Sequence, residues 1–132
     1  MANDSLPLIL QIGRPLRKLL KKDYKYKIEP FPIMTGVNMY IYAFYAKKEN
    51  IDSNDLFYIV NNHYFYEGFK LVDKQIEEDE IKIFFEKKDE KIEFEIKMYR
   101  FFMLNRELGN FSFGYNDFRQ GKGGFFTTIQ VF

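Results

Sequence analysis

The sequence predicts an α+β domain built on an antiparallel sheet of five or six strands with one main helix, preceded by an extended N-terminal arm that carries a short basic helix. All four prolines of the 132 residues lie among the first 32, and proline is excluded from central strands and helix interiors. The later residues alternate apolar and polar side chains in short runs, as half-buried strands do. We therefore expect an arm over residues 1–27 and a sheet domain over residues 28–132.

The arm is expected to begin with a short extended segment over residues 1–13, because Pro7 interrupts its apolar residues. Those apolar residues are Leu6, Leu8, Ile9, Leu10 and Ile12. Pro15 suits the first position of a helix, and leucines spaced i, i+3 and i+4 from Leu16 predict one apolar stripe on a helix that extends to about residue 25. The basic residues around that stripe are Arg14, Arg17, Lys18, Lys21 and Lys22. A helix this short is marginal when unpacked, so we expect it to dock on another surface.

The first predicted strand, residues 39–46, is apolar or aromatic on both of its faces. A strand of this kind is either covered on both faces or exposes one face to a partner. We expect the face that carries Tyr40, Tyr42 and Phe44 to be a contact surface.

A helix and a hairpin are predicted further along the chain. Asp52 or Ser53 suits the N-cap of the helix, and its expected buried stripe is Leu56, Ile59, Val60 and His63. Two runs of period-two alternation then flank a polar turn at residues 87–91, which is typical of an antiparallel hairpin. Residues 100–108 could extend the second arm of this hairpin or form a short helix. A closing strand is expected over residues 125–132, with Phe125, Thr127, Ile129 and Val131 on one face.

Composition narrows the classes of function. Net charge is +1, so the chain lacks the global charge of a nucleic-acid-binding protein. Residues 1–32 carry seven basic and three acidic side chains, a balance of +4, and the rest carry −3. The absence of cysteine excludes disulfides and thiolate sites. Phe and Tyr number 16 and 10; either several rings lie on the surface, or the core simply uses Phe in place of Leu.

No pattern in the sequence predicts catalysis. His63 is the only histidine and has no partner at a motif spacing, so we expect a packed side chain. Glu86, Glu93 and Glu95 alternate with apolar residues and belong to a solvated face. The Gly-Lys-Gly-Gly run at residues 121–124 lacks the hydroxyl residue that follows lysine in a phosphate-binding loop. We expect no cofactor, no metal ion and no enzymatic activity.

The sequence favours a non-enzymatic structural or assembly subunit of a larger protein complex, of the phage-virion connector or tail type. It would dock onto other subunits of a homo- or hetero-oligomer through its arm and aromatic sheet surface. The predicted contact residues are Leu8, Ile9, Leu10, Ile12, Arg14, Arg17, Lys18, Lys21, Lys22, Tyr40, Tyr42 and Phe44. The alternative is a small regulator or inhibitor that binds nucleic acid through the basic helix or imitates it through the acidic residues 73–95. Apolar runs are too short for a membrane span, no signal peptide is expected, and the predicted location is a virion or the cytoplasm.

Overall fold

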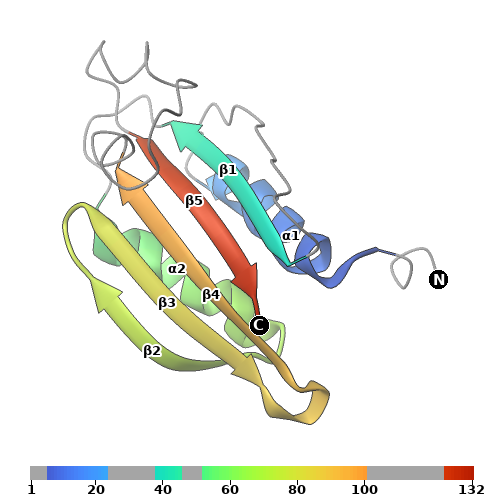
Figure 1. The fold of residues 1–132 in the computed structure, drawn as a ribbon. Helices are drawn as coiled ribbons and strands as arrows, with labels where there is room; N and C mark the ends of the chain where they lie inside the picture. Colours follow the sequence, from blue (N-terminus) through green and yellow to red (C-terminus); the bar gives the residue numbers. More distant parts are fainter. Residues whose placement is uncertain (1–5, 24–37, 46–51, 101–123) are drawn as a thin grey trace.

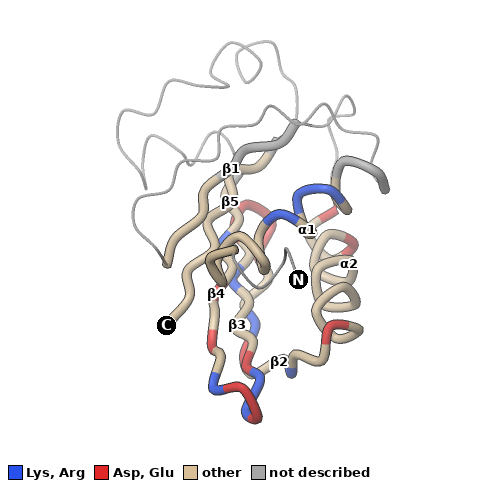
Figure 2. Tube along the Cα trace, turned by 90° about the vertical axis from the view of Figure 1, so that its right-hand side faces the viewer, with Lys and Arg blue, Asp and Glu red and all other residues tan. Residues whose placement is uncertain are grey.

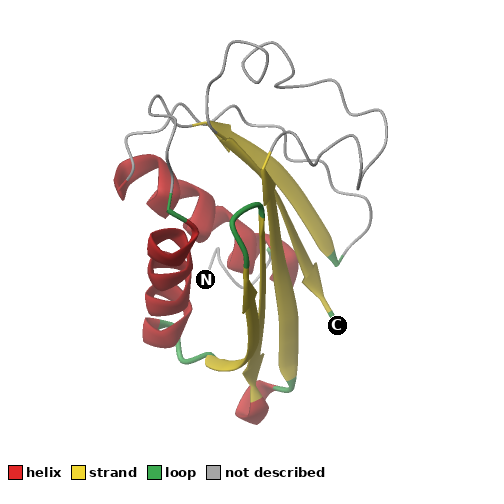
Figure 3. Cartoon of the chain, turned by 90° about the vertical axis from the view of Figure 1, so that its left-hand side faces the viewer, coloured by secondary structure: helices red, strands yellow, loops and turns green. Residues whose placement is uncertain are grey.

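The computed structural model describes residues 6–23, 38–45, 52–100 and 124–132. A five-stranded antiparallel sheet with strand order β1-β5-β4-β3-β2 is covered on one face by two helices (Figure 1, Figure 3). The elements are α1 Leu8–Asp23, β1 Met39–Tyr45, α2 Ser53–Tyr66, β2 Lys70–Ile76, β3 Glu80–Lys87, a 3-10 turn Lys88–Glu90, β4 Ile92–Arg100 and β5 Gly124–Val131. The predicted α+β class and antiparallel sheet are confirmed. The expected arm boundary near residue 27 and the expected elements between residues 101 and 123 lie outside the described residues.

Strands β2 to β5 form a meander, and β1 adds to its far side by pairing with β5. Helix α2 connects the two edge strands, β1 and β2, across one face of the sheet (Figure 1). The predicted hairpin is β3 and β4, in which Ile83 lies opposite Ile96 and Phe85 opposite Phe94. These four side chains are buried beneath the helices, as the period-two alternation requires.

Helix α2 begins as predicted, and two residues of its predicted stripe, Leu56 and Val60, are buried. Asp52 is the N-cap, and its carboxylate accepts a hydrogen bond from the backbone N–H of Asn54 at 2.8 Å. The buried residues are Ser53, Leu56, Phe57, Val60 and Tyr64. The predicted members Ile59 and His63 are only half-buried, because the large rings of Phe57 and Tyr64 turn the helix toward the sheet on their own side.

Helix α1 begins directly after Pro7 rather than at Pro15, so the extended segment predicted over residues 1–13 is wrong for residues 8–13. Pro15 lies inside the helix. Its fixed φ is helical, and its ring removes one backbone hydrogen bond without ending the helix. Ile9, Ile12, Leu16 and Leu20 are buried on one side at helical spacing, and that packing stabilises the helix across the proline.

Both helices and the sheet share a single hydrophobic core. Apolar side chains of α1 and α2 belong to the same buried cluster as those of β3, β4 and β5. Tyr64 of α2 is 1% exposed, and its ring contacts Phe85 and Phe94 at centroid distances of 5.1 and 4.8 Å. Its hydroxyl donates a buried hydrogen bond of 2.8 Å to the carbonyl oxygen of Ile12. Tyr64 therefore connects α1, α2 and the sheet.

Helix α1 approaches β1 most closely at Gly13. A Cβ atom at this position would lie 2.5 Å from Cδ1 of Tyr40, a separation that real side chains essentially never show. The Tyr40 ring is 1% exposed and has no room to move away. The absence of a side chain at Gly13 thus allows the helix to pack on this ring.

We predict that Gly13→Ala lowers the free energy of unfolding by up to about 2 kcal/mol. The overpacking penalty, about 1–3 kcal/mol, exceeds the gain of roughly 1 kcal/mol from replacing a helical glycine by alanine. Urea denaturation followed by circular dichroism measures the change. Lys18→Ala, on the exposed side of the same helix, is the control; equal or greater stability of the Gly13 variant would contradict the close contact.

We also predict that Tyr64→Phe destabilises the fold by about 0.5–1.5 kcal/mol, the usual net value of a buried hydrogen bond. The variant keeps the ring and removes only the hydroxyl that binds the Ile12 carbonyl. Tyr58→Phe is the matched control, because the Tyr58 side chain is exposed and its hydroxyl should contribute little. Equal midpoints for the two variants in urea denaturation would show that the link between the helices is unimportant.

Candidate functional site

The apolar residues predicted to contact a partner lie in the interior of this chain. Ile9, Leu10, Ile12 and Tyr40 are all buried in the core beneath or within α1. Leu8 is exposed, and the side chains of Tyr42 and Phe44 lie outside the described part of the structure. The four buried side chains cannot form an accessible surface in this fold, because the chain's own sheet already covers them.

The basic residues predicted for the site differ in their exposure along α1. Arg14 and Lys18, one turn apart on α1, are exposed, and Figure 2 shows the basic positions along this helix. Arg17 is half-buried and donates a hydrogen bond of 3.1 Å from Nη1 to the Tyr40 hydroxyl. Lys21 and Lys22 lie in the last turn of α1, where side chains are outside the described part of the structure. Of the aromatic positions, Tyr42 pairs with Thr127 and Phe44 with Phe125 along the β1–β5 ladder.

An exposed aromatic surface lies instead on the outer side of α2. Tyr58, Phe65 and Tyr66 are 59%, 68% and 86% exposed, and the Phe65 and Tyr66 rings are in edge-to-face contact. We call these three residues the α2 aromatic surface. The sequence analysis did not predict this surface. It expected Ile59 and His63 to be buried, whereas Phe57 and Tyr64 are buried instead, and this difference changes which side of α2 faces outward. The i, i+7 and i+8 spacing of the exposed rings was the available signal.

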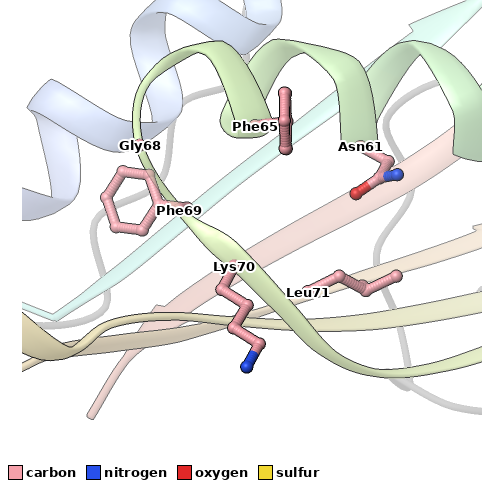
Figure 4. Close-up of a pocket in the computed structure, with 6 residues that line it drawn as sticks. All are labelled: Asn61, Phe65, Gly68, Phe69, Lys70 and Leu71. Atoms are coloured by element: carbon pink, nitrogen blue, oxygen red, sulfur yellow. The ribbon is translucent and has the colours of Figure 1, made fainter.

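An open groove of about 460 Å³ lies between the C-terminal half of α2 and the start of β2 (Figure 4). Its lining residues are Asn61, Phe65, Gly68, Phe69, Lys70 and Leu71. Gly68 makes the turn between the helix and the strand, with a φ of +92° that favours glycine. The groove thus has a helix with an amide and a ring on one side and an extended backbone on the other, and we call it the α2–β2 groove.

Strand β2 is an edge of the sheet and pairs only with β3 among the described strands. Its register shifts between Leu71 and Asp73, which makes Val72 the extra residue of a β-bulge. Val72 is about half exposed although it lies within the strand. The outer edge of β2 is therefore accessible next to the groove.

The sheet face opposite the helices carries paired charges along β3 and β4. Lys82 is 3.2 Å from Glu80, and Lys97 is 3.4 Å from Glu95. These ion pairs follow each strand rather than crossing between strands, and they offset the repulsion between Lys82 and Lys97, which lie opposite each other. The solvated face predicted for the glutamates matches this arrangement, and ion pairs this exposed contribute about 0–1 kcal/mol each.

His63 lies on the side of α2 between the core and solvent. Its ring is 4.7 Å from that of Tyr64 in an edge-to-face contact. Burial lowers the pKa of His63 from its ordinary value of 6.5, and the charge of Glu67 opposes that shift. The neutral imidazole is therefore favoured in the folded chain.

We predict that the folded state loses stability as the pH falls from about 7.5 to about 5.5, the range in which an unperturbed histidine gains its proton. The lowered pKa means that the unfolded chain binds this proton more readily. The contribution of the neutral His63 side chain to the free energy of unfolding is therefore fully present above the ordinary histidine pKa, and it is lost as the pH falls below that value. His63→Gln should remove most of this dependence in urea denaturation. If the free energy of unfolding changes with pH equally in the variant and the original protein, a group other than His63 causes the pH dependence.

The described residues contain neither a metal-binding cluster nor a membrane-spanning helix. Within residues 6–23, 38–45, 52–100 and 124–132, no group of three His, Cys, Asp or Glu side chains could hold a metal ion. Neither helix in the described part of the chain is long and apolar enough to cross a membrane. Comparison with protein-family models, curated proteins and solved structures found no match.

Proposed function

We propose that this protein is a non-enzymatic assembly subunit that docks onto another protein through the α2 aromatic surface. The observation that carries the proposal is the set of three exposed rings, Tyr58, Phe65 and Tyr66, on a helix whose other side is fully packed. Tyrosine and other aromatic residues are enriched at the centres of protein interfaces. The phage-virion connector or tail type and a virion or cytoplasmic location stay predictions from the sequence.

The rings of the α2 aromatic surface are exposed although α2 itself is well ordered by its caps and its packing. Helix α2 is capped at its start by Asp52. At its end the backbone N–H of Glu67 donates to the carbonyl oxygen of His63, and that of Gly68 donates to the carbonyl oxygen of Phe65. Val60 and Tyr64 hold its inner side against the sheet. A partner would therefore meet a rigid row of rings, which reduces the entropy lost on binding.

The second candidate function, a nucleic-acid-binding regulator, is favoured by the exposed pair Arg14 and Lys18 on α1. Two exposed cations one turn apart can contact successive phosphates, and such contacts weaken as salt rises. This surface lies on the other helix, so substitutions separate the two candidates.

We predict that Tyr58→Ser combined with Tyr66→Ser abolishes association with the partner while leaving the fold intact. Both side chains are exposed, so little stability should be lost. The tagged full-length protein, purified from the cells that make it, is compared with the variant by quantitative mass spectrometry and light scattering. The expected result is a complex larger than the 16.0 kDa chain that disappears in the variant.

The matched control is Arg14→Ser combined with Lys18→Ser, which changes two exposed residues on α1. Loss of the complex in this control and not in the tyrosine variant would contradict the proposal. If that complex also contains nucleic acid and dissociates steeply with salt, the second candidate is correct.

A further inference from the structure

We infer that the edge of β2 and the α2–β2 groove bind an extended, acidic peptide segment of the partner, which adds a sixth strand to the sheet. This inference rests on the proposed function and names the mode of docking. Edge strands with accessible backbone groups bind extended peptides in this way, with side-chain pockets giving specificity.

The backbone of β2 requires an extended occupant. The strand pairs with β3 on one side and has no strand neighbour on its other side among the described residues (Figure 1). Backbone donors and acceptors on that side point outward in the plane of the sheet, where only another strand satisfies them in series. A helix or a folded surface would leave them bound to water.

The groove gives the apolar part of the recognition. Phe65, 68% exposed, and Asn61 project from α2 on one side, and Leu71 extends from β2 below Asn61 (Figure 4). Side chains of an added strand alternate between the two faces of the sheet. Those on the helix side would enter the groove between Phe65 and Leu71, so we expect an aliphatic residue there. The exposed Val72 extends the apolar contact along the edge.

The lysines of β2 determine the charge of the occupant. Lys70 and Lys74 are exposed and have no carboxylate partner among the described residues. By contrast, the lysines of β3 and β4 each have one: Lys82, Lys87 and Lys97. Lys74 Nζ instead lies 4.9 Å from the centroid of the Phe57 ring. Asp73, which lies between Lys70 and Lys74, is also exposed and accepts a hydrogen bond from the Lys74 backbone N–H, so the two lysines and this carboxylate leave the strand with a net charge of +1. That positive charge favours acidic residues on the opposing strand.

The test uses the full-length chain and a labelled synthetic peptide, acetyl-Ser-Glu-Val-Thr-Glu-Val-Ser-amide, titrated by fluorescence anisotropy at low salt. We expect saturable binding that weakens about fivefold in Phe65→Ala and in Lys70→Glu, as loss of one good interface contact predicts. Phe132→Ala and Lys88→Glu are the matched controls, because each side chain is exposed and lies outside both the groove lining and the α2 aromatic surface. Backbone N-methylation of the peptide should abolish binding, and amide exchange of residues 70–76 should slow when the unmodified peptide binds.

The inference would be overturned if binding did not saturate, or if a peptide with lysine in place of glutamate bound with the same affinity as the acidic peptide. It would also be overturned if both Phe65→Ala and Lys70→Glu left the affinity unchanged. A dimer of this chain that Lys70→Glu dissociates would likewise overturn it. The last would make a second copy the occupant. Peptide binding without a cellular partner would refute the proposed function alone. A partner lost with the tyrosines but no peptide binding would refute only the docking mode.

Discussion

The burial of Tyr64 is the constraint on which the rest of the structure depends. Its ring fills the space between α2 and the hairpin strands, and its hydroxyl satisfies a backbone carbonyl of α1. A buried phenol needs such a partner, because an unbonded hydroxyl in an apolar core costs about 1–3 kcal/mol. Placing Tyr64 inward fixes the rotation of α2. That rotation in turn leaves Tyr58, Phe65 and Tyr66 on the outside.

The same packing explains why the N-terminal segment belongs to the domain. Its apolar residues have an intramolecular partner, since Ile9, Leu16 and Leu20 are fully buried against the sheet. Gly13 allows the close approach of α1 to Tyr40, and Arg17 binds the hydroxyl of the same ring. The segment that looked unable to bury its own apolar groups therefore completes the core. The exposed apolar area lies on the opposite side of the helical layer, along α2 and the β2 edge.

The two edge strands of the sheet differ in a way that bears on function. Strand β1 packs beneath α1, whereas β2 carries two unpaired lysines and a bulge at Val72. Bulges and lysines on an edge discourage indiscriminate pairing between sheets. The same features are compatible with one acidic, extended partner. Opposite charge and a defined register favour the binding of that strand over others. In the proposed docking mode, protection against aggregation and selective binding would use the same residues.

The β3–β4 hairpin was determined by the sequence alone, because period-two alternation around a polar turn leaves one choice of face for Ile83, Phe85, Phe94 and Ile96. The N-cap at Asp52 was equally predictable, because its hydrogen bond joins residues only two positions apart. The start of α1 and the exposed side of α2 were not determined in this way, so the sequence did not show that Ile9, Leu10, Ile12 and Tyr40 are buried. Pro15 predicts the start of a helix, and packing of Ile9 and Ile12 in the core instead extends α1 back to Leu8. Helix α2 has apolar or aromatic residues on every side, so contact with the sheet decided which of them remained exposed.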